Sequence, residues 1–462
     1  MPKIFDLVVI GGGPAGSEAA TNAAALGKRV ALIEEQKLGG TCLNYGCDPT
    51  DTLLHIAQML YSAQTCNPYG LHVSHARADW KSVQAYVRRV MKQIRGGSVQ
   101  EANRNLKAQG ITFIQGKARF VSPHTVEVKG REVRGKNFVI ATGVKNVVPP
   151  IPGLEDAGYI THREAVSLPT LPRRMAIIGS MPMAMEFAQL FHRFGVQVTV
   201  LEPALEILAG EDRELAQRLM KILEGEGVRF EVGVMFDSVT RVRKEKIIQF
   251  HCPDEPIQKL VVDEILVMVG RRPILDELNL EAAGVEYTDE GITINATGRT
   301  TVPHIWAAGD VTGGAQFSSR AADHGRFVVR NVFSKKPQPF EEPLVPWIIS
   351  TDPAIAHLGK AEEDLWQEGV TFRVGKLELG KIDRAIMNGE SDGLVKLLAD
   401  EEGHLLGAHI LARNAGDMLA PAVIVMRQGL TVDALADAIL PYPVMSDAVR
   451  WAADQLVEKD DG

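Results

Sequence analysis

Two copies of one local pattern constrain the fold of this chain more than any other feature. Each copy reads as an apolar strand, a glycine-bearing turn, a helix and a second strand. Units of this kind build parallel sheets and bind nucleotides at the turn, so the chain is predicted to hold two nucleotide-binding folds rather than a repeat array. The first copy covers residues 5–10, 11–16, a helix to about residue 26, and 29–34; the second covers 175–179, a helix over 182–194, and 196–202.

The first turn has the glycine spacing of a dinucleotide site. Gly11, Gly13 and Gly16 follow a strand and open a helix. The first glycine makes the tight turn, the second lets the backbone approach a pyrophosphate, and the third lets the helix pack on the sheet. The helix N-terminus then faces the phosphate charge. Glu34, which ends the next strand, is placed to accept a hydrogen bond from a ribose hydroxyl.

Composition narrows the class of protein. A chain of 462 residues with 45% hydrophobic and 23% charged residues is expected to form two to four globular domains. The net charge of −8 argues against a nucleic-acid partner, and no apolar run approaches the ~20 residues of a membrane helix. With only 4 cysteines and no leader-like start, we expect a cytoplasmic enzyme rather than a disulfide-stapled one.

The segment 39–47, Gly-Gly-Thr-Cys-Leu-Asn-Tyr-Gly-Cys, closely resembles the redox motif of the class I pyridine nucleotide-disulfide oxidoreductases, the group of dihydrolipoamide dehydrogenase and mercuric reductase. The resemblance covers essentially the whole chain. It also includes the first glycine turn and the residues around Thr142, Gly143, Gly270, Gly309 and Asp310.

This resemblance implies an α/β fold with two Rossmann-like domains, one for FAD and one for NAD, and a C-terminal α+β dimerisation domain. The implied boundaries are 1–148 and 271–340 for the FAD domain, 149–270 for the NAD domain and 341–462 for the dimerisation domain. A homodimer is implied as well. By position, Cys47 is the thiol beside the flavin and Cys42 the thiol that meets the acceptor. An acidic residue such as Asp310 binds hydroxyls of the ribityl chain.

The chain departs from the family pattern just after the second cysteine. The family has an isoleucine or valine and then a lysine where this chain has Asp48 and Asp51. That lysine pairs with a glutamate on the second nucleotide helix, which here is Glu186. Two carboxylates without a cation between them raise at least one pKa or recruit a cation. Without a cation, a Cys47 thiolate and an anionic reduced flavin are both disfavoured. No metal ligand is assigned.

A second departure lies near the C-terminus. Disulfide-reducing members supply a histidine there across the dimer interface, and Tyr442 stands at its place, with Asp447 at the place of its acidic partner. A phenol is a poor base at pH 7, so turnover of common disulfides is not expected. Tyr442 either takes part in catalysis or packs in an interface. Tyr442 and the pair Gln316-Phe317 are similar to mercuric reductase, but residues 457–462 hold no vicinal cysteine pair.

The second glycine turn is altered. Gly179 is followed by Met181 where the second glycine is expected, whereas Ala184 at the third place is tolerable. Glu202 at the end of the next strand favours NADH over NADPH by binding a 2′-hydroxyl. The spacing of Met181, Met183 and Met185 suggests packing rather than a copper site, because alternate residues do not share a helix face.

Three functions remain open on these residues. The first is FAD-dependent transfer of electrons from NADH through Cys42 and Cys47 to a small acceptor, either a quinone or a metal ion. The second is a disulfide reductase resembling dihydrolipoamide dehydrogenase. The third is a flavin-binding redox partner or sensor without nicotinamide turnover, motivated by Met181, Asp51 and Tyr442.

Overall fold

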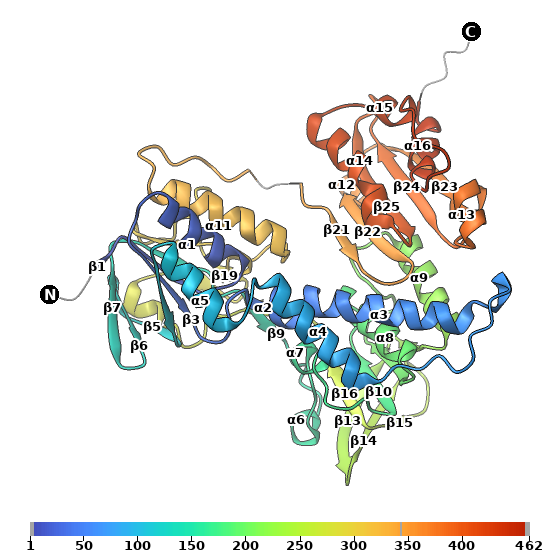
Figure 1. The fold of residues 1–462 in the computed structure, drawn as a ribbon, viewed down its shortest axis with the longest axis horizontal. Coiled ribbons are helices and arrows are strands. Elements are labelled where there is room, and N and C mark those ends of the chain that lie inside the picture. The colour runs from blue at the N-terminus through green and yellow to red at the C-terminus, as the bar shows by residue number, and fades with distance from the viewer. Residues whose placement is uncertain (1–3, 342–343, 458–462) are drawn as a thin grey trace.

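The structure is a computed structural model that describes residues 4–341 and 344–457. It contains two nucleotide-binding units and a third, C-terminal sheet domain (Figure 1). The long helix α3 (Cys47–Thr65) lies between the second unit and the C-terminal domain. None of the helices in the described part of the chain combines the length and the apolar composition that crossing a bilayer requires.

The first unit is a five-stranded parallel sheet whose central strands are fully buried. Its order is β20-β8-β2-β3-β4, so strands about 300 residues apart in the sequence, β2 (Leu7–Ile10) and β20 (Ile305–Ala307), belong to one sheet. Helix α1 (Pro14–Ala25) covers the sheet together with α11 (Ser318–Val332). The strands are β2 (Leu7–Ile10), β3 (Val30–Glu34), β4 (Ile111–Gln115), β8 (Phe138–Ile140) and β20 (Ile305–Ala307).

The first predicted strand is interrupted. The sequence pattern predicted one strand over residues 5–10, but β1 (Ile4–Phe5) pairs in parallel with β7 (Arg131–Gly135) in a different sheet. Asp6 separates β1 from β2, and its carboxylate accepts a hydrogen bond from the Arg29 backbone N–H at 3.0 Å. The chain therefore changes sheets at Asp6, which hydropathy alone does not show.

The second unit repeats the plan with a four-stranded parallel sheet in the order β12-β11-β10-β16. Helix α8 (Pro182–Arg193) follows the second glycine turn and is almost entirely buried, which explains its run of apolar residues. A separate antiparallel sheet of β13 (Met235–Val242), β14 (Glu245–His251) and β15 (Gln258–Val262) stands beside it. The parallel strands are β10 (Arg174–Ile178), β11 (Gln197–Glu202), β12 (Arg229–Val232) and β16 (Glu264–Val267).

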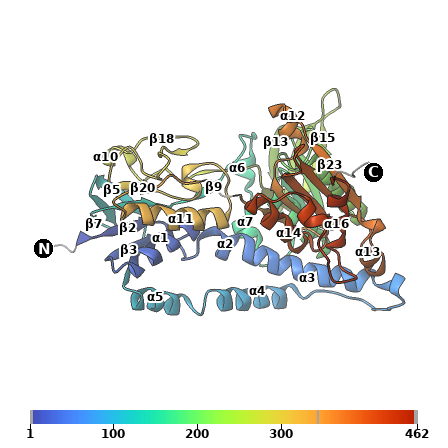
Figure 2. The same ribbon diagram turned by 90° about the horizontal axis from the view of Figure 1, so that it is seen from above.

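Helices α3, α4 (Trp80–Ile94) and α5 (Val99–Ala108) line one side of the molecule (Figure 2). The short helix α2 (Gly40–Tyr45) is followed by α3, and α3 packs against both α8 and α4. Helix α5 continues along the same side to the first unit. Because Cys47 is the first residue of α3, the packing of α3 on α8 fixes the start of the redox motif against the second unit.

The C-terminal domain is an antiparallel five-stranded sheet in the order β21-β22-β25-β24-β23. Helices α14 (Ala415–Gln428) and α16 (Asp447–Asp454) pack on it, so the predicted α+β character is confirmed. Its strands are β21 (Trp347–Ile349), β22 (Ala354–Gly359), β23 (Arg373–Glu378), β24 (Leu394–Ala399) and β25 (Leu405–Ala412).

A buried ion cluster joins this domain to the second unit. The ammonium of Lys396 on β24 lies 2.8 Å from Asp212 and 2.8 Å from Glu362, and the side chains of Lys396 and Asp212 are almost fully buried. Removal of one member of a buried ion pair leaves its partners charged in a medium of low polarity. The cluster therefore stabilises the contact between the two domains as long as it is complete.

We expect Lys396→Met to lower the free energy of unfolding by about 3–5 kcal/mol, because Asp212 and Glu362 then remain buried without a cation. Chemical denaturation followed by circular dichroism measures the change. Arg134→Ala is the matched control, because the Arg134–Glu132 pair at 2.8 Å is exposed, and such pairs contribute at most about 1 kcal/mol. Equal effects of the two substitutions would contradict this assignment.

Candidate active site

A single cavity of about 820 Å³ lies at the carboxyl ends of the parallel strands and extends from the first glycine turn to α8. Ligands of doubly wound sheets bind at this edge. The cavity collects most of the site residues predicted from the sequence: Gly11, Gly13, Glu34, Cys42, Cys47, Thr142, Gly143, Glu186, Gly270, Gly309 and Asp310.

The first glycine turn has the geometry that a pyrophosphate requires. Gly11 has φ +107°, and a Cβ there would lie 2.2 Å from the Ala141 carbonyl oxygen. A Cβ on Gly16 would lie 1.9 Å from the Gly11 carbonyl oxygen, so both places demand glycine. Gly13 is different, because its backbone is extended and a Cβ would meet nothing closer than 3.8 Å. Its missing side chain therefore leaves room for a ligand rather than for the protein.

Two carboxylates face the same cavity. Glu34 accepts hydrogen bonds from the Gly12 N–H at 2.7 Å and the Gln36 N–H at 2.6 Å, which holds it at the end of β3. Asp310 is mostly buried, and its Oδ1 has no hydrogen-bond partner among the described residues. Burial raises the pKa of Asp310, and the charges of Arg271 and Arg320 oppose that shift. An unpartnered acceptor beside a glycine cradle fits the hydroxyls and pyrophosphate of FAD.

The two cysteines lie where α2 ends and α3 begins, and both are free thiols. A hydrogen bond from Cys47 lowers the pKa of Cys42 to about 7, and a hydrogen bond with Ser318 lowers it further. Burial and the charges of Asp48 and Asp51 act in the opposite direction and raise the pKa of Cys42. The Cys42 Sγ lies 4.0 Å from Asp48 Oδ1. The same contact with Cys42, followed by burial, raises the pKa of Cys47. Cys42 is therefore the thiol that ionises first.

A buried carboxyl pair lies beside Cys47. Glu186 on α8 accepts a hydrogen bond from the Ser350 N–H at 2.8 Å, and the Ser350 side chain bonds to Asp51 on α3. Burial raises the pKa of Glu186 to about 8, the Ser350 hydrogen bond lowers it and the Asp51 charge raises it further. No cation is among the groups that shift it. At neutral pH Glu186 is therefore mostly protonated.

The second glycine turn keeps the backbone of the first but not its open space. Gly179 has φ +101°, and a Cβ there would lie 2.5 Å from the Met268 carbonyl oxygen. Met181 has φ −63° and ψ 163°, close to the −74° and −172° of Gly13, so the side chain causes no backbone strain. Met181 is 43% exposed and lines the cavity. Glu202 accepts a hydrogen bond from the Ala204 N–H at 2.8 Å.

The three methionines separate in the structure. Met185 is fully buried in the core, in agreement with packing. Met181 and Met183, however, both line the cavity. The argument that alternate residues do not share a helix face does not apply to them, because Met181 is the residue before the first turn of α8 rather than a member of the helix.

The two C-terminal candidates lie outside the cavity lining. Tyr442 is 72% exposed, and its hydroxyl donates to Asp383 Oδ2 at 2.7 Å. Asp447 begins α16 and forms a 3.6 Å ion pair with Arg450. Within one chain the structure therefore brings neither residue to the thiols, and a role for them across a dimer interface stays a prediction.

Sequence reasoning missed three residues of the site, namely Ser318, Ser350 and His162. Ser318 bonds to Cys42, and Ser350 contacts both carboxyls described above. Burial lowers the pKa of His162 to about 4, and its Nε2 has no hydrogen-bond partner among the described residues. Each comes from a segment remote from the cysteine motif, so no local pattern marks it.

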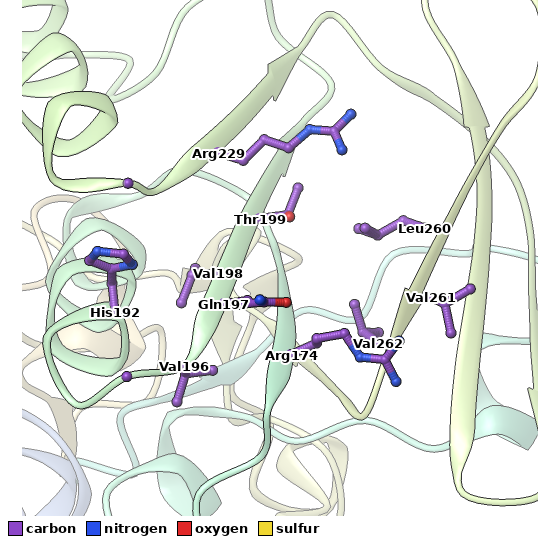
Figure 3. A pocket seen from close by; sticks show the side chains of 12 residues that line it. Arg174, His192, Val196, Gln197, Val198, Thr199, Arg229, Leu260, Val261 and Val262 are labelled. Atoms are coloured by element: carbon purple, nitrogen blue, oxygen red, sulfur yellow. The ribbon is translucent and has the colours of Figure 1, made fainter.

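A second, smaller cavity of about 390 Å³ lies at the opposite, amino-terminal edge of the β10–β12 strands (Figure 3). Arg174 and Arg229 lie on two sides of it. Arg174 is paired with Glu245 and Asp263, both at 2.8 Å, and Arg229 bonds to Glu231. These cations are already neutralised by carboxylates, so the cavity is not assigned an anionic ligand.

The fold and the large cavity define a protein with two dinucleotide-binding units and a cysteine pair between them. The chain belongs to the pyridine nucleotide-disulphide oxidoreductase family, whose model matches residues 5–325, and the dimerisation domain of that family matches residues 345–453. Members of this family are flavin-dependent enzymes that use FAD and a nicotinamide dinucleotide.

The mercuric reductase of Bacillus cereus is 34% identical over 452 residues, which cover 97% of this chain and 71% of that protein. The dihydrolipoyl dehydrogenase of Thermus scotoductus is 34% identical over 460 residues and covers 98% of each chain. Among solved structures, the Cu(II) complex of the HOCl-induced flavoprotein disulfide reductase RclA from Escherichia coli superimposes with a TM-score of 0.88 at 29% identity, over 98% of this chain and 100% of that one.

We expect Gly13→Met to weaken FAD binding at least ~10-fold without unfolding the protein, because a side chain there occupies the space of the pyrophosphate while the backbone accepts a methionine, as Met181 shows. The ratio of flavin to protein absorbance after gel filtration measures occupancy. Gly225→Met is the control, because a Cβ on Gly225 meets nothing within 4 Å. Full flavin occupancy in Gly13→Met would place the pyrophosphate elsewhere.

We expect alkylation of Cys42 by iodoacetamide in the reduced protein to rise about tenfold per pH unit up to about pH 7 and then level off, because the thiolate is the nucleophile. In Cys47→Ala the hydrogen bond to Cys42 is lost, so the plateau moves toward the ordinary thiol pKa of about 8.5. Peptide mass spectrometry separates Cys42 from the other cysteines. An unchanged profile in Cys47→Ala would mean that Cys47 does not set the Cys42 pKa.

Proposed function

We propose that this protein passes electrons from NADH, through FAD and the Cys42–Cys47 pair, to a small acceptor, and that the acceptor is a metal ion such as Cu(II). The observation that carries the proposal is the state of Tyr442. Its hydroxyl is bound by Asp383, and that contact raises the pKa of the phenol above its usual value. The residue at the histidine's place is therefore a poorer acid than a free tyrosine, and a smaller fraction of it is ionised at neutral pH to act as a base.

The two kinds of acceptor differ in what they require from the protein. A disulfide acceptor releases a thiolate that needs a proton from an acid near neutral pKa, and a missing acid of this kind typically costs ~10²–10⁴-fold in rate. A metal ion takes electrons without a proton. Two metal ions each accept one electron from the reduced cysteine pair, the Cys42–Cys47 disulfide forms, and the thiol proton leaves to solvent.

The surroundings of the thiols support a cationic acceptor. Asp48 and Asp51, which stand where the family has an apolar residue and a lysine, place carboxyl groups around the cysteine pair. Negative charge at the mouth of a site raises the local concentration of cations. A mercuric reductase and a flavoprotein with a Cu(II) complex are also among the proteins that this chain is similar to.

NADH rather than NADPH is proposed as the donor, because Glu202 at the end of β11 is placed to bind a 2′-hydroxyl and repels a 2′-phosphate. The protein is also proposed to act as a homodimer. Its dimerisation domain exposes large apolar side chains that a partner subunit would cover, among them Ile386, Met387, Ile424, Ile439 and Tyr442.

One observation favours a second candidate, a flavin-binding redox partner without nicotinamide turnover. Met181 lines the cavity at the place where a pyrophosphate would approach the second turn. Anaerobic mixing with NADH and, separately, with NADPH distinguishes the two functions. Bleaching of the flavin by NADH supports the first; no bleaching by either dinucleotide supports the second.

The acceptor is tested by reoxidation of the anaerobically reduced enzyme. We expect Cu(II) to restore flavin absorbance at least ~10-fold faster than dissolved oxygen, and faster than a quinone, lipoamide or glutathione disulfide. Cys42→Ser should remove the advantage of Cu(II). The proposal fails if oxygen is as fast as every added acceptor. Faster reoxidation by lipoamide, lost in Cys42→Ser, would instead identify a disulfide reductase.

We expect Met181→Gly to lower KM for NADH about 10-fold with little change in kcat, because a backbone contact with the pyrophosphate binds the ground state and the transition state equally. Steady-state kinetics with the best acceptor measure both constants. Met183→Leu is the control, since Met183 lines the same cavity but lies outside the turn. An unchanged KM in Met181→Gly would show that this side chain does not obstruct the dinucleotide.

A further inference from the structure

The carboxyl pair of Asp51 and Glu186 is not used by the proposed electron transfer, and its position calls for a separate role. The Glu186 side chain is 9% exposed, lines the cavity and is fixed by the Ser350 N–H at 2.8 Å. Its charge acts on the Cys47 thiol, and so does that of Asp51. A buried and oriented carboxyl group that lines the same cavity as the Cys47 sulfur can act as its proton donor, directly or through one water molecule.

Of the described elements that pack on α8, α3 and the segment after β21 contribute groups that act on Glu186, and β11 contributes none. From α3 this carboxyl group faces Asp51 and the Cys47 thiol, and from the segment after β21 it faces Ser350, which is neutral. Arg193, two turns further along α8, is bound by Glu226 at 2.6 Å and Asp352 at 3.0 Å.

We propose that Glu186 gives a proton to Cys47 Sγ when the Cys42–Cys47 disulfide is reduced. Asp51 is a positioning residue, because its charge keeps the proton on Glu186. This inference deepens the proposed function at the internal step between FAD and the cysteines.

The step balances in electrons and protons. Two electrons, supplied by bound FAD, break the Sγ–Sγ bond. Cys42 Sγ keeps its electron pair as a thiolate, and Cys47 Sγ forms a bond to the Glu186 proton, which leaves a carboxylate that solvent in the cavity reprotonates. The direction of transfer agrees with the two groups, since the pKa of Glu186 is about 8 and that of Cys47 is raised above the ordinary thiol value.

The assignment of the two thiols follows from the same arrangement. Cys42 has the lowered pKa and remains the thiolate that meets the acceptor, whereas Cys47 is held as a thiol. A lysine at position 51 would favour a thiolate at Cys47 instead. The hydrogen bonds of Cys42 with Cys47 and Ser318 therefore place the negative charge of the reduced pair on Cys42, against the charges of Asp48 and Asp51.

The experiment follows electron transfer from flavin to disulfide in the FAD-loaded protein by stopped-flow absorbance, with dithionite as reductant. It needs neither NADH nor an acceptor, so its failure is distinguishable from failure of the proposed function. We expect the wild-type rate to be flat below about pH 8 and to fall about tenfold per pH unit above it, because Glu186 loses its proton there. Glu186→Gln should be ~100-fold slower at pH 7 and independent of pH.

Two further variants separate proton donation from a structural role. Asp51→Asn should move the fall in rate to lower pH, because removal of the Asp51 charge lowers the pKa of Glu186. Glu363→Gln is the matched control; Glu363 is another carboxyl whose pKa burial raises, on α12 (Glu362–Glu368) outside the cavity lining. It should leave the rate and its pH dependence unchanged.

A measurement that does not depend on bound FAD tests the proposal even in a variant that has lost FAD. In FAD-free protein carrying Cys42→Ser, alkylation of Cys47 at pH 10, where Glu186 is ionised with or without Asp51, should become several-fold faster when Glu186→Gln or Asp51→Asn is added, because each removes a negative charge near the thiol. Three results would each overturn the proposal. The first is electron transfer at the wild-type rate in Glu186→Gln at pH 7, and the second is a fall in rate at the same pH in Asp51→Asn as in the wild type. The third is an unchanged rate of Cys47 alkylation in either variant.

Discussion

The packing of α3 against α8 is the contact on which the site depends. Helix α3 belongs in sequence to the first nucleotide unit and α8 to the second, yet they pack side by side beneath the C-terminal sheet (Figure 1). This contact brings Cys47 and Asp51 to Glu186, and Ser350 from the C-terminal domain closes the group. Interiors of low polarity penalise unpaired charge. An aspartate at position 51, in place of the lysine of the family pattern, therefore changes the protonation of every group in the cluster.

As a consequence, the two sulfurs of the reduced pair differ in their tendency to carry a negative charge. In a site with a lysine beside the inner cysteine, the cation would stabilise an inner thiolate. Here the hydrogen bond with Cys42 and the neighbouring carboxyls oppose a charge on Cys47, while hydrogen bonds from Cys47 and Ser318 favour a charge on Cys42. The reduced pair therefore presents its nucleophile at Cys42. This arrangement suits an acceptor that meets a thiolate directly and does not wait for an external acid.

The two glycine turns share one backbone conformation but differ in the space that they leave for a dinucleotide. Gly11 and Gly179 have nearly the same φ, and Gly13 and Met181 are both extended just before a helix that begins with proline. The fold of the turn depends on the first glycine, where a Cβ would strike a carbonyl in either copy. The space above the turn depends on the second position. A methionine there preserves the fold while it narrows the approach of a dinucleotide.

The sequence by itself determined the two nucleotide units, the third α+β domain and the redox motif, because these rest on local periodicity, turn chemistry and a short motif. It also marked Asp51 and Glu186 as a pair, through resemblance. It did not show that the first strand changes sheets at Asp6, or that Ser318, Ser350 and His162 belong to the site. Those facts depend on contacts between segments far apart in the chain. Burial, which raises the pKa of Glu186, exists only once the domains have packed together, so the tertiary structure alone decided the protonation of that carboxyl group.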